Sequence, residues 1–522
     1  MLPCNTVNCN IAIVGGGPAG TYAAMKLGEE YGKRVCLFEK EGRIGGRLYD
    51  IKTYPNLPNS TFIAVGGRRI LSKQCIMINL ANELGIEIEY PTTEEQFCFA
   101  RGEYHFVTDS FGYNNFSHLY PGLLELNGLN GNLSENSINV KAELEKRLIS
   151  RLNTTQELLF LEQSSLESYI ISMIGLVGYQ YLSELTRFKA DFKSNISPKS
   201  YIDFLRDECR NGGDEGYPIG GMSQFPKKME AKARDFGVRI FSSENIVSVD
   251  KVNISSYELL SKQRRIFADR VIFAVPTTEL RLINGSIAES IVSQPQFKAI
   301  KSIQVMTVSQ WFKKPWWKEL KNNLTGKKIW RAWTTDNCIG HVEIPREDYL
   351  NQTNVIRTVY QDIPVCIEQY SSLIQTNQMG KLKNLIHRGL KTLFQGNNIT
   401  NNVHIPKAFK TVVKIWPGAW FFQRGGSPYT NDEIKAWAID PINDTNVGLA
   451  SDAYNIDRST WSQGAILSAN KLLREKYNVT ERLTSETCDF NPASSCMRTK
   501  NKECLRQDAG PERDSCKIWR YM

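Results

Sequence analysis

The chain has 522 residues, of which 41% are apolar and 23% charged, so it is long enough for two or three packed units of ordinary globular composition. Lysine and arginine exceed the acidic residues by nine, but they are scattered without a basic run, and the sequence does not predict nucleic-acid binding. No apolar run approaches the roughly 18 residues that a membrane-spanning helix needs.

The first predicted unit is a strand, a helix and a second strand. The apolar run IAIVGGG at 11–17 is typical of a strand buried on both faces, and PAGTYAAMKLGEEYG at 18–32 has apolar residues at helical spacing. KRVCLFEK at 33–40 gives a second short strand. A βαβ unit of this length implies a parallel sheet with a right-handed crossover.

A GxGxxG motif lies between this first strand and its helix. Gly15 permits a tight turn, Gly17 lets the backbone approach a pyrophosphate, and Gly20 allows the helix to pack closely on the strand. The pyrophosphate would lie at the helix N-terminus, where free N–H groups favour anions. Glu39, at the end of the second strand, is placed to bind ribose hydroxyls and disfavours a 2′-phosphate. The motif predicts a cofactor that contains ADP, without separating FAD from NAD.

Two glycine-arginine segments follow the motif. GRIGGRLYD supplies Gly46 and Arg47, and VGGRRI supplies Gly67, Arg68 and Arg69. Residues without side chains let a loop approach a ligand, and the planar guanidinium group suits phosphate. Ordinary glycine turns with surface arginines are the alternative for either segment alone. Two such segments at these distances from the nucleotide motif favour contacts with the cofactor.

The rest of the chain changes character twice. Residues 140–210 have apolar residues at three- and four-residue spacing, which predicts an inserted helical block. From about 237 the strand pattern returns, and QVMTVSQWF at 304–312 with NVIRTVYQDI at 354–363 suggests an antiparallel sheet. QGAILSANKLLREKY at 463–477 predicts a last helix. We therefore expect a nucleotide unit assembled from discontinuous pieces.

Cysteines and glycosylation motifs indicate an oxidising compartment. Of twelve cysteines, Cys4 and Cys9 lie near one end, and four lie in the last thirty-five residues: Cys488, Cys496, Cys504 and Cys516. Free thiols or zinc ligands are the alternative, but this tail contains no CxxC and no histidine. Asn-X-Ser/Thr motifs begin at Asn59, Asn115, Asn132, Asn153, Asn195, Asn253, Asn284, Asn323, Asn351, Asn398, Asn443 and Asn478. We expect a secreted glycoprotein whose leader has been removed.

In these motifs the sequence resembles the FAD-dependent amine oxidase family, and within it the secreted L-amino-acid oxidases of mollusc ink and mucus. The resemblance covers most of residues 4–480 and is densest in CNTVNCNIAIVGGGPAGTYAAMKL and LFEKEGRIGGRL. Further matches are VGGRRI, GYPIGGMSQFPKKM, FKKPWW, RVIFAVP, NVGLASDAY and STWSQGAILSA. The resemblance implies FAD as the cofactor.

The resemblance also implies an α/β fold with three parts. These are a Rossmann-type FAD-binding domain built from discontinuous segments, a substrate domain with a mixed sheet, and an inserted helical lobe. The expected boundaries are 8–70, 215–297 and 440–482 for the FAD-binding domain, 71–115 and 298–439 for the substrate-binding domain, 116–214 for the helical lobe, and 483–522 for a cysteine-rich tail.

Roles at the cofactor follow from the resemblance, residue by residue. Ile246 would lie at the adenine, Gly67 and Arg68 beside the isoalloxazine, and Asp452 near the ribityl chain or phosphates. Trp461 would flank the ring. The residues that would bind the ADP half and the phosphates are Gly15, Gly17, Gly20, Glu39, Gly46 and Arg47.

The resemblance places the reaction at Arg69, Trp420 and Trp461. Arg69 aligns with the arginine that holds the substrate carboxylate, and a guanidinium can grip a carboxylate with two hydrogen bonds. A structural arginine paired with an acid is the alternative. Trp416 and Trp420 would wall the substrate cavity, or would simply belong to the core.

The implied reaction transfers a hydride from the α-carbon of an L-amino acid to flavin N5, and O₂ reoxidises the flavin to give a 2-oxo acid, ammonia and H₂O₂. Most family members carry a lysine in the strand before FKKPWW, and residues 305–308 contain none. A flavin-dependent isomerase of polyunsaturated fatty acids and a non-catalytic flavoprotein therefore stay as alternatives. The expected ligand is a small-molecule carboxylate, no metal is required, and a homodimer is left open.

Overall fold

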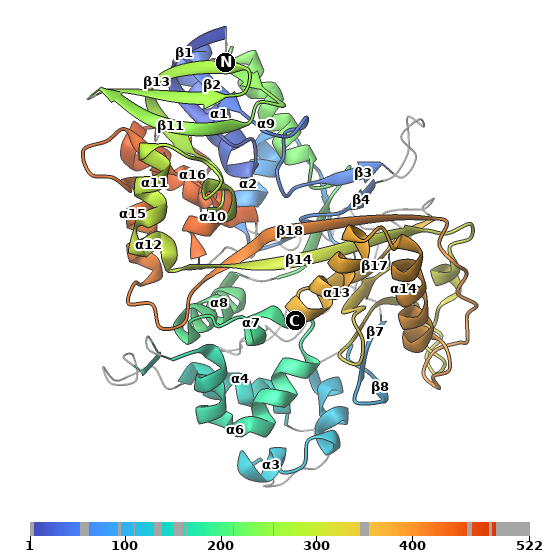
Figure 1. Cartoon of the computed structure of the whole chain (residues 1–522). Helices are drawn as coiled ribbons and strands as arrows, with labels where there is room; N and C mark the ends of the chain where they lie inside the picture. Colours follow the sequence, from blue (N-terminus) through green and yellow to red (C-terminus); the bar gives the residue numbers. More distant parts are fainter. Residues whose placement is uncertain are drawn as a thin grey trace, which may run out of the picture.

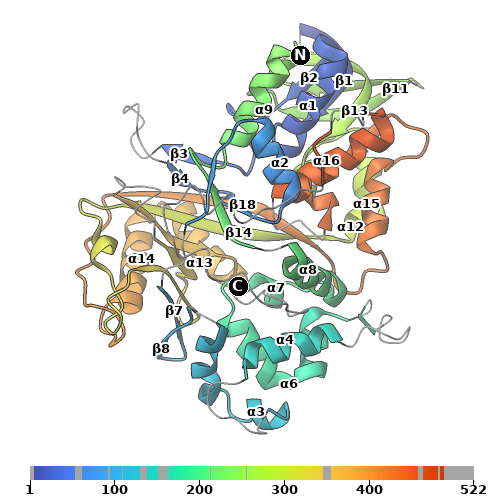
Figure 2. The same cartoon turned by 180° about the vertical axis from the view of Figure 1, so that it is seen from behind.

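The structure is a computed structural model that describes residues 5–52, 62–91, 95–108, 110–129, 138–150, 160–161, 164–211, 213–253, 255–344, 354–456, 462–479 and 483–486. Figures 1 and 2 show three regions from opposite sides. The N-terminal strand lies in one sheet, two long strands cross the middle of the molecule in a second sheet, and a group of helices lies beyond these strands.

The first sheet has the strand order β10-β2-β1-β13-β12-β11, and β19 also pairs with β13. Its strands are β1 (Asn5–Val14), β2 (Val35–Phe38), β10 (Arg239–Phe241), β11 (Ile246–Asn253), β12 (Ser256–Ser261), β13 (Arg264–Phe273) and β19 (Val447–Leu449). β1 runs parallel to both β2 and β13, so the predicted parallel βαβ unit is confirmed. The first strand ends before the glycines, because Gly15 has a φ of 107° and leaves the extended conformation.

Helices cover both faces of the first sheet. Ile11 and Ile13 pack into one core and Ala12 and Val14 into the other, which is why residues 11–14 at the end of this strand are all apolar. The helices of the first core are α1 (Pro18–Tyr31), α2 (Cys75–Glu83), α9 (Gln224–Asp235) and α16 (Ser462–Tyr477). Those of the second are α10 (Thr277–Leu280), α11 (Ser286–Ser293), α12 (Pro295–Lys298) and α15 (Asn431–Ile439).

The second sheet has the strand order β18-β14-β17-β16-β15-β7-β8. Its strands are β7 (Glu95–Ala100), β8 (Glu103–Phe106), β14 (Ile300–Trp311), β15 (Ile329–Thr334), β16 (His341–Glu343), β17 (Val355–Gln361) and β18 (Lys410–Gln423). β14 and β17 are antiparallel, as predicted. Helices α13 (Pro364–Gln375) and α14 (Met379–Phe394) pack against the sheet. The sequence analysis did not identify β18.

The predicted helical block packs on the other side of the second sheet. Its helices are α3 (Leu123–Leu126), α4 (Val140–Ser150), α6 (Leu166–Leu185), α7 (Ala190–Lys193) and α8 (Pro198–Asn211). The indole N–H of Trp333, in β15, donates a 2.9 Å hydrogen bond to the Leu185 carbonyl at the end of α6. This hydrogen bond joins the helical block to β15, a buried strand of the second sheet.

Short elements connect these regions. The strands are β3 (Asp50–Lys52), β4 (Phe62–Ala64), β5 (Ile70–Leu71), β6 (Ile88–Glu89) and β9 (Glu215–Pro218), and the 3₁₀ helices are η1 (Gly32–Arg34), η2 (Ser110–Leu119), η3 (Trp316–Glu319) and η4 (Asp452–Tyr454). β5 and β9 are antiparallel, with Leu71 opposite Glu215. This pairing brings Glu215 close to Arg69 although the two are far apart in sequence.

In two disulfides both cysteines lie within the described residues. Cys9 in β1 is bonded to Cys36 in β2, and Cys338 is bonded to Cys366. Cys98 is a buried free thiol. Cys9, one of the two cysteines noted near the start, thus bonds to the neighbouring strand, while Cys4 and the cysteines of the tail lie outside the described residues. No helix in the described stretches is both long and apolar enough to span a membrane.

The Cys9–Cys36 bond closes a loop of 27 residues. Replacing both cysteines with alanine is expected to lower the free energy of unfolding by about 3 kcal/mol, because the unfolded chain regains the freedom that the cross-link removes. Denaturation of the oxidised protein in urea measures this change. Equal denaturation midpoints for the variant and the parent protein would contradict it.

Candidate functional site

The GxGxxG turn leaves no room for side chains at Gly15 and Gly20. A Cβ atom on Gly15 would lie 2.6 Å from the Ala274 carbonyl oxygen, and one on Gly20 would lie 1.9 Å from the Gly15 carbonyl oxygen. At Gly17, the N-cap of α1, a Cβ atom would meet only the Gly46 Cα at 4.0 Å. No side chain caps this helix end, so its first N–H groups are available to an anion. The turn fits a pyrophosphate.

Glu39 lies against this turn. Its Oε2 atom accepts a 2.7 Å hydrogen bond from the Gly16 N–H, and its Oε1 atom accepts a 2.8 Å bond from the Glu41 N–H. Burial raises the pKa of Glu39, although these backbone donors oppose the shift. A carboxylate oxygen can accept a second hydrogen bond, so ribose hydroxyls fit here. The Glu244 N–H donates to the Glu39 carbonyl at 2.8 Å, which places Ile246 nearby in sequence at the start of β11.

The first of the two glycine-arginine segments packs directly on the turn. The Gly45 N–H donates to the Gly16 carbonyl at 2.8 Å, and a Cβ atom on Gly46 would lie 3.0 Å from the Gly17 Cα. Arg47 is next in the chain, and its Nη1 atom donates to Asp452 Oδ2 at 2.7 Å. The structure therefore brings the predicted phosphate-binding residues and Asp452 together.

A bulge in β18 completes this corner. Trp416 pairs with Val305 and Trp420 with Ile303, so β18 has extra residues between two registers of its partner strand. Within this bulge, the Ala419 carbonyl accepts a 2.8 Å hydrogen bond from Arg47 Nη1. The bulge thus ties the second sheet to the loop that contacts the glycine turn.

A cavity of about 240 Å³ begins at Pro18, the first residue of α1, and extends between the two sheets. Trp416 also lines it. Ile246 is not among its lining residues, and Trp461 lies outside the described residues. The predicted site residues that line this cavity are Arg47, Gly67, Arg68, Arg69, Trp420 and Asp452.

Arg69 lies in a buried network of ion pairs. Its Nε atom is 3.1 Å from Glu215 Oε1, and its Nη1 atom is 3.6 Å from Glu343 Oε1. Arg331 contacts the same two carboxylates, at 3.2 Å and 3.3 Å. Arg69 therefore pairs with acids, as the structural alternative supposed, and also lines the cavity. The two roles are compatible because a guanidinium group has five N–H donors.

This network holds more positive than negative charge. Arg68 and Arg357 also pair with Glu343, and Arg357 lines the cavity. The guanidinium groups are those of Arg68, Arg69, Arg187, Arg331 and Arg357, and the carboxylates are those of Glu215 and Glu343. Among the described residues this network holds five guanidinium groups and two carboxylates, so it favours an anionic ligand.

The pKa shifts of residues in this network agree with its excess of positive charge. Burial alone would raise the pKa of Glu215, but Arg331, Arg69 and Arg187 hold it well below its ordinary value. Burial and the neighbouring arginines lower the pKa of Arg187 to about 9. Burial is the largest cause that lowers the pKa of His341, and the charge of Arg357 lowers it further. This imidazole, which lines the cavity, is therefore neutral.

Aromatic rings wall the cavity on one side. The Tyr360 ring stacks on His341 with centroids 4.3 Å apart and on Trp420 at 6.3 Å. Phe188 makes edge contacts with all three rings. Trp416 donates from its indole N–H to the Val65 carbonyl at 2.7 Å. Among the described residues that line this cavity there is no lysine, in agreement with the lysine-free stretch of β14.

Asp191, in α7, supplies a carboxyl group to the cavity. Its Oδ1 atom is buried and has no hydrogen-bond partner among the described residues. Burial, and next the charge of Asp362, raise the pKa of Asp191 well above its ordinary value. Burial thus favours the protonated form of this carboxyl group, in which it can donate a hydrogen bond.

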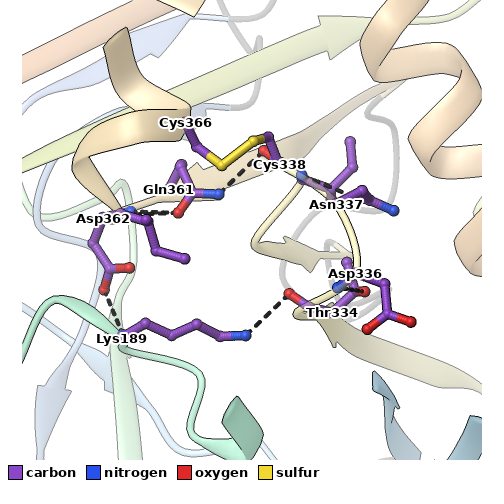
Figure 3. The surroundings of a disulfide bond; sticks show 10 residues. Lys189, Thr334, Asp336, Asn337, Cys338, Gln361, Asp362 and Cys366 are labelled. Carbon is purple, nitrogen blue, oxygen red and sulfur yellow. Dashed lines mark hydrogen bonds between the residues drawn. A yellow bond between two sulfur atoms is a disulfide. The ribbon is translucent and has the colours of Figure 1, made fainter. Parts of the chain in front are cut away.

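The wall that carries Asp191 is fixed to the second sheet, as Figure 3 shows. The Lys189 N–H donates to Asp362 Oδ2 at 3.0 Å, and Lys189 Nζ donates to the Thr334 carbonyl at 3.2 Å. Gln361 Nε2 donates to the Cys338 carbonyl at 3.2 Å, beside the Cys338–Cys366 disulfide. The bond from Lys189 to Asp362 holds the segment before α7 against the end of β17, and the disulfide joins the segment between β15 and β16 to α13.

Sequence reasoning missed residues of the second sheet that line the cavity or belong to its ion-pair network. They are Arg331 in IWRAWT, His341 and Glu343 in HVE, and Arg357 and Tyr360 in VIRTVYQ. The available signal was a charged residue inside a strand that is otherwise apolar, since every residue of these three strands is buried. A buried charge requires a partner, which marks such positions as candidates.

A dinucleotide-binding turn beside a cavity that the second sheet lines is the arrangement of a flavoprotein oxidoreductase. A family model described as flavin containing amine oxidoreductase matches residues 18–351, which is more than half of the chain, so the chain belongs to this family. The protein is an FAD-dependent oxidoreductase, as predicted, and the family fold is confirmed.

Similar proteins and structures agree with this assignment. The chain is 24% identical to Aplysianin-A of Aplysia kurodai, over 91% of this chain and 92% of that protein. Achacin of Lissachatina fulica is 40% identical over 77 residues, which is 14% of that protein. Among solved structures, cyclohexylamine oxidase from Brevibacterium oxydans IH-35A has a TM-score of 0.62 at 15% identity, covering 89% of this chain and 100% of the other. A putrescine oxidase triple mutant has a TM-score of 0.61 at 16% identity, covering 91% and 100%.

Gly20→Ala is expected to abolish FAD retention, because the new methyl group would occupy the space of the Gly15 carbonyl oxygen. The visible absorption of the purified protein measures bound flavin. Gly380→Ala is the matched control, since a Cβ atom there meets nothing within 4 Å. If Gly20→Ala keeps the flavin content of the control, the turn does not seat the cofactor.

Asp191→Asn is expected to change how stability depends on pH. An acid whose pKa is raised on folding binds more protons in the folded state, so its contribution to stability falls as pH rises above about 4. Asparagine keeps the shape and removes this titration. The Tm of the variant, relative to the parent protein, should therefore increase from acidic to neutral pH. A difference that stays constant with pH would show that Asp191 ionises normally.

Proposed function

We propose that this protein oxidises an L-amino acid at the α-carbon, with FAD as the hydride acceptor and O₂ as the final oxidant. One observation carries the proposal: the buried cluster of five guanidinium and two carboxylate groups lies at a cavity that begins at the nucleotide turn. Such a cluster favours a ligand that carries a carboxylate.

Arg69 and Arg357 are the members of this cluster best placed to bind the carboxylate. Both line the cavity, and Glu215 and Glu343 orient Arg69 before any ligand enters. A group that is held in advance loses little entropy on binding. Gly67 is two residues from Arg69 and lines the same cavity, so the carboxylate would hold the substrate beside the proposed flavin position.

The excess positive charge would also prepare the substrate amine. An ammonium group next to several buried cations is disfavoured, so the pKa of the α-amine would fall on binding. The neutral amine is the form from which a hydride can leave. Bound FAD would accept that hydride, and the substrate would become an imine, which water hydrolyses to the 2-oxo acid and ammonia. O₂ would reoxidise the flavin and be reduced to H₂O₂.

The same charges favour an amino acid over a simple amine. The putrescine oxidase and cyclohexylamine oxidase structures are named for amines that carry no carboxylate, and they are similar to this chain in fold. A buried excess of guanidinium groups would be unfavourable around such a cation. The similarity to Aplysianin-A over most of both chains supports the resemblance to mollusc enzymes.

Secretion and glycosylation are part of the proposal. Two disulfides lie within the described residues, which fits an oxidising compartment. Every acceptor asparagine that the structure describes is exposed, namely Asn115, Asn195, Asn253, Asn284, Asn323, Asn398, Asn443 and Asn478.

Arg69→Met is expected to weaken amino-acid binding by about 2 to 4 kcal/mol, as a large rise in KM, because the charge-assisted bonds to the carboxylate are lost. Anaerobic bleaching of the flavin, screened over the twenty L-amino acids, measures the reaction directly. Arg101→Met is the control, since Arg101 forms a half-exposed ion pair with Glu184 away from the cavity lining. Equal KM values for both variants would place the carboxylate elsewhere, and no bleaching by any amino acid would refute the oxidase.

The polyunsaturated fatty acid isomerase stays as the second candidate, because no lysine occurs among the described residues that line the cavity. In that reaction Arg69 would hold the fatty carboxylate and no net oxygen chemistry takes place. Incubation with a polyenoic acid would then shift its ultraviolet absorbance toward a conjugated product without H₂O₂. An unchanged spectrum excludes this alternative.

A further inference from the structure

One segment carries most of the chain's net positive charge. From 369 to 431 the sequence contains no aspartate or glutamate. It contains eight basic residues, whereas lysine and arginine exceed the acids by nine in the whole chain. These residues are Lys381, Lys383, Arg388, Lys391, Lys407, Lys410, Lys414 and Arg424.

These eight cations are not neutralised by the protein. None of them forms an ion pair with a carboxylate in the described part of the chain. The arginines of the inner cavity behave differently, since each of Arg68, Arg69 and Arg357 pairs with an acid. A basic group of this size without counter-charges favours an anionic ligand from solution.

The fold gathers four of these cations and a histidine around one hollow. Helix α14 buries Leu382, Ile386 and Leu390 in the core, and it lies on the outer side of the second sheet, away from the glycine turn (Figure 1). Two adjoining cavities, of about 180 Å³ and about 610 Å³, share Asn384, His387 and Lys407. The basic residues that line one or both are Lys381, Lys383, His387, Arg388 and Lys407, and Lys391 lies one turn further along α14.

The environment of His387 shows the local positive field. Burial is the largest cause that lowers its pKa, and Lys391, Lys407 and His404 lower it further. Gln310, in β14, also lines this hollow and can donate a hydrogen bond. The hollow therefore combines charged and neutral donors from a helix, a strand and the segment before β18.

We propose that this hollow binds a soluble ligand that carries two or more phosphate or sulfate groups. A single oxyanion would leave most of the larger cavity empty, and several cations converge there from two segments of the chain. The cations surround a hollow instead of a flat face, which favours a small ligand over a flat lipid surface. Lysine is suited to this task, because its ammonium is a compact charge on a flexible stem that adapts to different phosphate positions.

The site is separate from the flavin cavity. Gln310 in β14 and Phe312 just after this strand line the hollow. Val305 and Thr307, which are also in β14, line the flavin cavity. The hollow and the flavin cavity share no lining residue. Binding at the hollow can therefore be tested on the FAD-loaded protein, whatever its substrate is.

The test is calorimetric titration of the FAD-loaded protein with inorganic tripolyphosphate at low ionic strength. We expect one equivalent to bind and the affinity to fall as salt is added. Lys381→Glu combined with Arg388→Glu should raise the Kd by about tenfold or more, because two attractive charges become repulsive. Both positions are exposed on α14, and the flavin absorbance of the variant reports whether it folds.

The matched control reverses two exposed lysines in the first sheet region, Lys33→Glu with Lys262→Glu. It changes the net charge equally and should leave the Kd within about twofold. An equal loss of affinity in both variants would show only a general charge effect and overturn the site. If the double variant on α14 loses its flavin, Lys383→Ala with Lys407→Ala replaces it, with weaker binding as the expected result. Binding to vesicles of anionic phospholipid without binding to tripolyphosphate would overturn the soluble ligand.

Discussion

The buried pairing of Arg69 with Glu215 and Glu343 is the interaction on which the geometry of the cavity depends. It connects the segment before β5 with β9 and with β16, and so joins the nucleotide-binding part to the second sheet. Taking guanidinium groups out of water costs several kcal/mol for each ion, and two carboxylates offset this only in part for five arginines. A ligand carboxylate supplies further negative charge. Ligand binding and the stability of this region therefore favour each other.

Local patterns were sufficient to predict the nucleotide half of the site. The turn at Gly15, Gly17 and Gly20 and the position of Glu39 depend on residues within one βαβ unit, where spacing determines geometry. For Gly46 the sequence predicted a contact with the cofactor, and the structure places this residue directly against the turn. The ion pair between Arg47 and Asp452 was not predicted, because these residues lie near opposite ends of the chain and no local rule connects them.

The substrate half could not be predicted in the same way. β18 was missed because Pro417 and Gly418 interrupt its pattern, and the structure accommodates them in a bulge that pairing with β14 makes possible. Arg331 and Arg357 lie in strands whose neighbours come from distant segments. Their carboxylate partners are known only after the sheet order is known. The basic residues of α14 likewise look scattered in the sequence, and become one group only when the helix lies beside the segment before β18.

The two positively charged sites differ in the kind of cation they use, and this difference argues for two different ligands. The inner cluster is built from arginines, which are oriented by acids and offer fixed pairs of donors, the geometry that a single carboxylate requires. The outer hollow has mostly lysines without acidic partners, whose positions can adjust. A rigid inner site suits a reaction in which one carbon must be held beside a cofactor, whereas an adaptable outer site suits attachment to ligands of variable shape. The protein thus separates positioning from attachment by its choice between two basic side chains.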